Sequence, residues 1–205
     1  MALPARLMLS PLPEELEFIA LQQTDILVRP HFTMGKIRLL SGSYGPFRAT
    51  ANIELPLWVG KYLKQQGKCA LVPPSWLNPD WLEEKLKQEM SKPEEFAPLP
   101  FRYAEIAKVF LDIAPEDVPS PERVRSLLKD IREVRQAKTR KGLALVDETE
   151  LRMTGLGSME INELRPFLIR AMGVMRVLAS VPEVPGTQDN SFAAGESGSR
   201  MEEDW

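Results

Sequence analysis

Residues that commonly carry enzymatic or metal chemistry are scarce in this chain of 205 residues, which has one cysteine (Cys69) and one histidine (His31). A single cysteine cannot form an internal disulfide, and Cys/His zinc modules need four ligands at fixed spacing. A serine or cysteine triad would have to run through His31, which follows Pro30 and has no second histidine to share a metal. These counts exclude disulfide-stapled scaffolds and Cys/His zinc modules, disfavour triad hydrolases, and lead us to expect no cofactor.

Two pairs of adjacent carboxylates, Glu83-Glu84 and Glu94-Glu95, could in principle do acid–base chemistry. Lysines lie close to both pairs in sequence, so a solvated, charged surface is the favoured interpretation. An enzyme with a carboxylate site stays open as the weakest of three functional hypotheses. Trp58, Trp76 and Trp81 could stack on bases, but their apolar neighbours favour packing in a core.

Two glycine-containing segments resemble nucleotide-binding loops only faintly. Six residues separate Gly60 from Gly67, where a phosphate-binding loop has four, and no Ser or Thr follows Lys68. The segment Gly155-Leu156-Gly157 lacks the third glycine of a dinucleotide-binding fingerprint and follows no expected strand. We interpret both as a helix end and a loop.

The strongest candidate for a binding function is residues 121–141, which contain 8 basic and 3 acidic side chains. Arg125, Lys129 and Arg132 could contact DNA or an acidic partner. An apolar stripe of Val124, Leu127, Leu128, Ile131 and Val134 lies roughly opposite these cations on a helix. The length of this stripe favours a structural helix whose basic side is secondary. A free-standing nucleic-acid-binding protein that uses the basic helix 121–141 remains the alternative.

The elements that would position these residues predict an α+β fold, with a small N-terminal β-rich domain followed by a larger all-α helical domain. After an N-terminal extension over 1–13, we expect the β-rich domain over 14–55 and the helical domain over 56–181. Period-two patterns and turn residues predict a short helix over 13–21, strands over 24–30, 36–40 and 50–55, and a turn over 41–46. Three- and four-residue apolar spacing predicts helices over 56–66, from 79 to about 90, over 100–114 and 121–141, and a last one ending near 180.

The formal net charge of −3 combines the basic helix with an acidic tail, because residues 182–205 alone carry a net charge of −5. With few large apolar side chains, this tail is predicted to be disordered. The longest apolar run, 169–181, contains Arg170 and Arg176 and is too short to cross a membrane, so we expect no membrane partner.

Six segments, in order, resemble the family of the second Psf subunit of the eukaryotic GINS DNA-replication complex, the partner of Sld five. The segments are Gly45-Pro46-Phe47; Leu55-Pro56-Leu57-Trp58; Lys68 to Trp76; Phe96-Ala97-Pro98-Leu99-Pro100 with Tyr103; Val124 to Arg132; and Met159-Glu160-Ile161-Asn162. The resemblance covers about residues 15 to 180, and it does not extend to residues 1–13 or 182–205.

The resemblance implies a nuclear, non-catalytic scaffold that forms a heterotetramer with three sibling GINS subunits. It further implies association with the MCM helicase ring and its Cdc partner, a bridge to the replicative polymerase, and mostly indirect contact with DNA on chromatin at the replication fork. From the apolar stripe and the last helix we expect the subunit interface to include Leu127, Leu128, Ile131, Val134, Leu164, Phe167, Leu168, Met172 and Met175. The small β-rich domain and the wide apolar helix faces also favour an obligate subunit over a monomeric enzyme.

Overall fold

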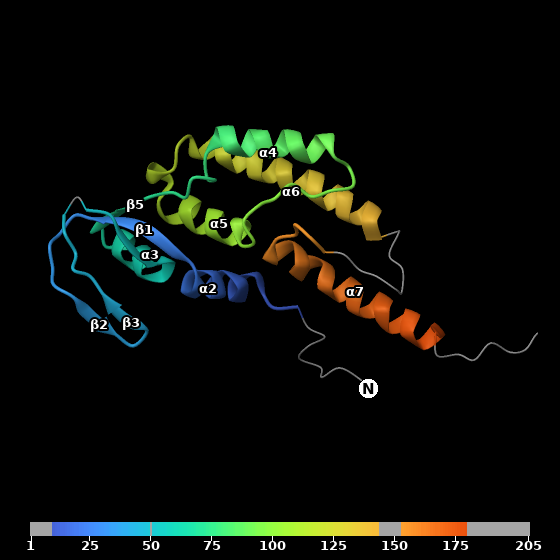
Figure 1. Ribbon diagram of the computed structural model, residues 1–205, viewed down its shortest axis with the longest axis horizontal. Helices are drawn as coiled ribbons and strands as arrows, with labels where there is room; N and C mark the ends of the chain where they lie inside the picture. Colours follow the sequence, from blue (N-terminus) through green and yellow to red (C-terminus); the bar gives the residue numbers. More distant parts are fainter. Residues whose placement is uncertain (1–9, 50, 144–152, 180–205) are drawn as a thin grey trace, which may run out of the picture.

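The computed structural model describes residues 10–49, 51–143 and 153–179. It has an N-terminal unit built on a small β-sheet, followed by a larger group of helices, as the sequence predicts (Figure 1). The expectations for the N-terminal residues 1–9 and for the acidic tail 182–205 lie outside the described residues.

The N-terminal unit is built around strand β1 (Asp25–Pro30), the middle strand of a three-stranded antiparallel sheet. Its side chains alternate between exposed and buried, with Ile26 and Val28 turned into the core. Strand β4 (Ile53–Pro56) pairs with one edge of β1, and strand β5 (Cys69–Leu71) pairs with the other. Because β5 follows the first helix of the expected helical domain, the expected boundary at residue 55 is too early, and this unit continues to about residue 71.

Two helices complete the N-terminal unit. Helix α2 (Pro13–Gln23) begins with a proline at its first position, and the N–H of Leu12 donates to Glu15 Oε2. Helix α3 (Leu57–Gln65) lies directly against the sheet. A Cβ at Gly60 would stand 2.9 Å from Ile26 Cδ1 and 3.3 Å from side chains of Val28 and Leu71, so a larger residue here would have to displace these core side chains.

The segment expected to be a simple turn contains a strand. Strand β2 (Ile37–Leu39) and strand β3 (Gly42–Tyr44) form a separate antiparallel hairpin. The two residues between them, Leu40 and Ser41, are enough to close a hairpin. The turn predicted over 41–46 is therefore wrong for residues 42–44, whose polar and glycine-rich composition hides the pairing.

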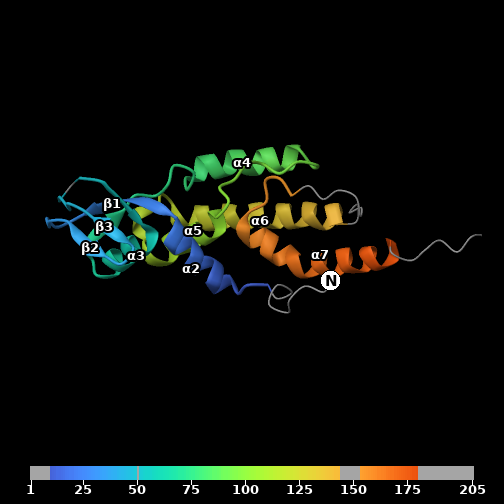
Figure 2. The same cartoon turned by 60° about the horizontal axis from the view of Figure 1, so that its bottom comes forward.

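The helical part contains α4 (Pro79–Ser91), α5 (Tyr103–Ile113), the 3₁₀ turn η1 (Pro115–Asp117), α6 (Pro121–Leu143) and α7 (Ser158–Ala179). Helices α4 and α6 lie side by side, Figure 1 shows α5 beneath them, and both views (Figures 1 and 2) show α7 running outward from the body. Helix α7 is continuous through Pro166, which lies inside it, so residues 159–162 belong to the helix.

One hydrophobic core joins the two units. It runs from Ile26, Val28 and Phe47 of the N-terminal unit to Phe110 of α5 and Ile131 of α6. Trp58, Trp76 and Trp81 are partly buried against it, which agrees with their interpretation as core residues.

Hydrogen bonds also join the two units. Asp117 Oδ2 in η1 accepts hydrogen bonds from Lys64 Nζ of α3 and from the N–H of Leu71 in β5, each at 2.8 Å. The β-rich unit therefore folds against the helices, as its small size predicts.

Candidate subunit interface

Within the described residues, no group of three or more His, Cys, Asp or Glu side chains could hold a metal ion. Cys69 is buried, and burial raises the pKa of its thiol to about 11, which leaves it protonated at neutral pH. No described helix is both long enough and apolar enough to span a membrane. The residues considered below are those that orient and line the exposed surfaces of the helices.

Arg135 of α6 lies at the centre of a buried polar cluster. Its side chain is wholly buried, and all five of its N–H groups have a partner. Nε and Nη2 donate to the two carboxylate oxygens of Glu160 at 2.6 and 2.8 Å, and Nη1 donates to Glu89 of α4 at 3.2 Å. The remaining donors bind the carbonyl oxygens of Ala97 and Gly155. One side chain therefore ties α6 to α4, to two loops and to the start of α7.

Glu160 connects this cluster to the first turn of α7. Its Oε2 accepts the N–H of Gly157 at 2.7 Å, so the carboxylate also caps the helix. Burial by itself raises the pKa of Glu160. The hydrogen bonds and charge of Arg135, with the donors Gly157 N–H and Tyr103 O–H, outweigh burial and hold that pKa below its usual range. Glu160 is therefore ionised at neutral pH.

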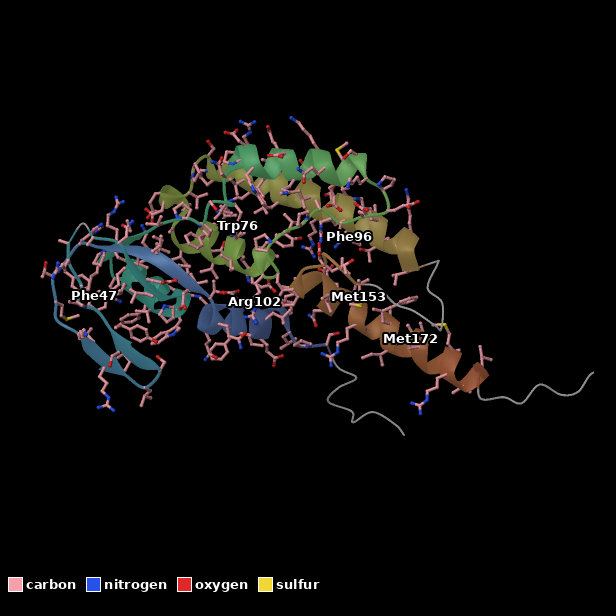
Figure 3. All side chains as sticks on the ribbon, viewed as in Figure 1. Phe47, Trp76, Phe96, Arg102, Met153 and Met172 are labelled. Atoms are coloured by element: carbon pink, nitrogen blue, oxygen red, sulfur yellow. The ribbon has the colours of Figure 1, made fainter. Side chains whose placement is uncertain are left out.

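Glu89 accepts hydrogen bonds from two further donors besides Arg135. Its Oε1 accepts from Lys138 Nζ at 2.9 Å, and its Oε2 accepts the N–H of Ala97 at 2.7 Å. Two buried cations, Arg135 and Lys138, thus face two buried carboxylates, and the charges balance. The ring of Phe96, which is labelled in Figure 3, covers the guanidinium of Arg135, whose Cζ lies 4.9 Å from the ring centroid.

The cluster brings together two of the segments that carry the family resemblance. Ala97 and Tyr103 come from one of the six segments named above, and Glu160 comes from another. Both segments contact Arg135 or its partner directly. The sequence pattern held a signal for this cluster, because Arg135 lies four residues after Ile131, on the line where the apolar stripe of α6 continues.

Beyond this anchored turn, α7 exposes large apolar side chains. Phe167, Val174, Val177 and Leu178 are each at least half exposed. Both ribbon views show the C-terminal half of α7 extending past the ends of α4 and α6 (Figures 1 and 2). An isolated exposed leucine is ordinary, but several on one projecting helix indicate an interaction surface.

Three of these residues share a regular spacing with two other positions of α7. Leu164, Phe167, Ala171, Val174 and Leu178 are separated by three, four, three and four residues, and we call this line the outer seam. Side chains of the outer seam line two hollows. One, of about 340 Å³, is bordered by Pro166, Phe167, Arg170, Ala171 and Val174. The other, of about 180 Å³, lies between α6 and α7 and includes Leu164.

The predicted interface residues divide by burial. Leu127 and Ile131 are buried in the chain's own core, because their side of α6 packs on α4 and α5, so neither is available to a partner. Leu168 is 8% exposed, whereas Phe167 is half exposed. The others, Leu128, Val134, Leu164, Met172 and Met175, are partly buried.

The prediction missed Ala171, Val174 and Leu178 as surface residues. Their signal was present in the sequence as the three- and four-residue spacing that starts at Leu164. Apolar residues occur on most sides of α7, so composition alone cannot tell the covered side from the open one. Which side of α7 is covered depends on how Arg135 and Glu160 orient the helix.

The basic side of α6 is largely matched by acidic partners. Arg125, Lys129 and Arg132 have side chains that are 45%, 75% and 58% exposed. Each forms an ion pair within the described residues, with Glu122, Glu133 and Glu163 in that order. Arg125 also donates to the carbonyl oxygen of Leu111 at 2.7 Å. These contacts reduce the free positive charge that a phosphate backbone would meet.

A second apolar groove lies on the N-terminal unit. Its volume is about 640 Å³, and it lies between α2, α3 and the β2–β3 hairpin. Phe18 and Leu40, at 59% and 111% relative exposure, border it together with Trp58. The molecule thus has an apolar surface near each end.

Comparison with known proteins covers both units. Residues 12–72 match the family model described as the PSF2 N-terminal domain, and residues 76–179 match the GINS complex protein helical bundle domain. The chain is 38% identical over 179 residues to the DNA replication complex GINS protein PSF2 of Debaryomyces hansenii, covering 87% of this chain and 86% of that protein. It is 38% identical to the Schizosaccharomyces pombe protein of that name (89% and 99% covered) and 33% identical to the human one (87% and 98% covered).

Proposed function

The chain belongs to the PSF2 family of subunits of the DNA replication complex GINS, and from that premise we propose that it is a non-catalytic structural subunit. It assembles with three sibling GINS subunits into a heterotetramer in the nucleus. The observation that carries the proposal is the exposed apolar side of α7, which a monomer in water would not favour.

The finer role that we propose is accessory to the replicative helicase. In this role the assembled complex joins the MCM ring and its Cdc partner during initiation and elongation of chromosomal replication, and it links the ring to the replicative polymerase. The two apolar surfaces, one on α7 and one between α2, α3 and the β2–β3 hairpin, support a bridging role. Contact with DNA is mostly indirect, which fits the internal pairing of the basic side chains on α6.

Within this role, α7 is the element that we assign to sibling contact. Its first turn is fixed by Glu160, so the direction of the projecting half is set before assembly. A pre-positioned helix loses less conformational entropy on binding than a segment that must fold first. Phe167 of the predicted interface belongs to this surface, and Val174 and Leu178 extend it.

The experiment is a pull-down of the tagged full chain from native nuclear extract, followed by mass spectrometry. We expect the three sibling subunits at near-equal amounts, and subunits of the MCM ring at lower amounts that fall with salt. Recovery of the siblings without MCM subunits at any salt concentration would contradict the helicase role alone. Recovery of the chain without siblings would contradict the proposal as a whole.

The same extract tests the alternative of direct DNA binding. If DNA contact is indirect, reversing the charges of Arg125, Lys129 and Arg132 to Glu leaves the DNA affinity of the native assembly unchanged. A marked loss of affinity, together with a smaller dependence on salt, would instead assign DNA contact to α6.

A further inference from the structure

We infer that the outer seam of α7 receives a single amphipathic helix with acidic flanking residues, supplied by a sibling subunit. This inference rests on the proposed function and specifies the partner chemistry of the same surface. It starts from the spacing of Leu164, Phe167, Ala171, Val174 and Leu178. Alternation of three and four residues keeps side chains on one line of a helix. A second helix can bury that line by knobs-into-holes packing.

The side chains on this line are open to a partner. Phe167, Val174 and Leu178 are 50%, 59% and 65% exposed. The small side chain of Ala171 lies between them, and Phe167, Ala171 and Val174 border the hollow of about 340 Å³. Large side chains on either side of a small one form the kind of hole that a knob from a facing helix fills. A flat sheet edge would leave this hollow empty.

Charge indicates the chemistry of the partner. From Leu164 to Ala179, α7 carries three arginines and no carboxylate. Arg170 borders the hollow on the outer seam, so it would face a flanking residue of the partner. Arg140, near the C-terminal end of α6, borders the neighbouring hollow. A partner helix that lies here meets positive charge, and acidic flanking residues complement it.

The same charges disfavour a second copy of this chain as the occupant. Two outer seams packed against one another would bring Arg170 of each copy near the seam of the other. Helix α7 has only two carboxylates, and one of them, Glu160, is buried and bound by Arg135. Glu163 itself is already engaged by Arg132 and by Gln136. Like charges at flanking positions oppose pairing, so a sibling chain is favoured over self-association.

The test measures cysteine protection in the complex formed by co-expressing the full chain with its three siblings. Val174→Cys places a thiol on the outer seam, and Arg176→Cys is the matched control. Arg176 is exposed and lies about 160° around the helix from the centre of the seam. The native Cys69 is buried, so it contributes little background. Each alkylation rate is compared with that of the same variant unfolded in urea.

The inference predicts that alkylation at position 174 in the complex is roughly tenfold or more slower than at position 176. Equal, fast alkylation at both positions would overturn the seam, yet the purified complex would leave the proposed function intact. Equal protection at both positions would overturn the one-sided packing. Failure of the wild-type chain to co-purify with its siblings would overturn the proposed function and the inference together.

Two further experiments test whether something other than a sibling covers the outer seam. A wild-type chain that forms dimers without siblings, with position 174 protected, would overturn the sibling assignment in favour of a second copy. Protection of position 174 by vesicles of phosphatidylcholine and phosphatidylserine, without siblings, would overturn it in favour of a lipid surface. The inference predicts neither result.

Charge reversal tests the acidic flanks independently of the cysteine variants. Arg170→Glu is expected to weaken assembly roughly three- to tenfold at low salt, because it places a carboxylate beside the acidic flank. Arg176→Glu is the matched control, since Arg176 lies about 160° from the centre of the outer seam on the same helix. Equal effects of the two substitutions would contradict the assignment of acidic flanks.

Discussion

Arg135 joins three helices through one group of charged side chains. It is 1% exposed, and it holds Glu89 of α4 and Glu160 of α7 in one buried, charge-balanced group with Lys138. Such a group contributes little net free energy compared with an apolar core, but loss of one member leaves the others buried and unpaired. Its main effect is on position, because α7 starts where Glu160 is held.

Replacing Arg135 with Met tests this dependence. We expect Arg135→Met to destabilise the folded chain by about 3–5 kcal/mol, because Glu89 and Glu160 are left without their cation. Arg132→Met is the control, since Arg132 is 58% exposed and its pair with Glu163 is worth about 1 kcal/mol or less. Thermal unfolding of the purified complex measures both. A similar, small fall in Tm for the two variants would show that the buried group does not fix α7.

Glu105 of α5 makes a second prediction at this scale. It is 2% exposed, and neither of its carboxylate oxygens meets a donor at full hydrogen-bond geometry within the described residues, although the Ser158 side chain and its own backbone lie near enough to lower its pKa in part. Burial raises the pKa of Glu105 above its ordinary value. The folded state therefore binds this proton more tightly than the unfolded state. Its stability is greatest below the unfolded pKa and declines as pH rises through the folded pKa.

Glu105→Gln removes this pH-dependent loss of stability. At pH 7 we expect the variant to be more stable than the wild type by about 1 kcal/mol, because no ionised carboxylate is buried. The advantage should shrink as pH falls towards the ordinary carboxyl pKa, where wild-type Glu105 is protonated. Melting curves between pH 7 and pH 5 provide the measurement. An advantage that stays constant across this range would contradict the assignment.

At the scale of elements, α7 combines an anchored end with an open one. Gly157 stands immediately before the helix, and a Cβ there would lie 2.9 Å from Tyr103 Cε1 and 3.3 Å from the carbonyl oxygen of Phe101. The helix start is therefore packed tightly against α5. Sixteen residues further along, a Cβ at Gly173 would meet no atom within 4 Å. The contrast separates the part of α7 that is set by this chain from the part left for a partner.

Alanine substitutions at the two glycines should act in opposite directions. Gly157→Ala is expected to destabilise the chain and displace α7, because the rigid ring of Tyr103 and a backbone carbonyl stand in the way. Gly173→Ala should stabilise the helix by up to about 1 kcal/mol, since alanine has the higher helix propensity. Circular dichroism melts of the co-purified complex compare them. Stabilisation by both substitutions would show that the start of α7 is not tightly packed.

Most elements could be predicted because their signals are local. The alternation of β1, the proline at the start of α4 and the long stripe of α6 each lie within one segment. The missed features depend on contacts between segments. β5 joins the sheet only because α3 returns the chain to the free edge of β1, and Arg135 is buried only because Glu89 and Glu160 meet it. The contact between Arg135 and Glu160 also determines which side of α7 stays exposed.

On the scale of the whole molecule, the N-terminal unit and the helices share one core, and an exposed apolar surface lies on each. The hydrogen bonds of Asp117 with Lys64 and Leu71 join the units where η1 meets β5. The shared core links the two surfaces through one packed body, as the proposed bridging role requires. The net charge of −3 gives little repulsion between copies to offset the exposed apolar area.

The isolated chain is accordingly expected to be poorly soluble, and co-expression of its siblings should rescue it. Burying Phe167, Val174 and Leu178 in an interface removes the surface that drives aggregation. The soluble fraction after expression alone and with the siblings gives the comparison. A well-behaved monomer with a sharp melting transition would count against an obligate subunit.

The central claim, that the apolar side of α7 joins this chain to its siblings, is tested most directly by native mass spectrometry of the four co-expressed chains. The double substitution Phe167→Glu with Leu178→Glu charges the outer seam, and Met90→Glu charges an equally exposed residue of α4. The account predicts a heterotetramer with one copy of this chain for the wild type and for Met90→Glu, and its loss for the double variant. A double variant that assembles like the wild type would contradict the claim.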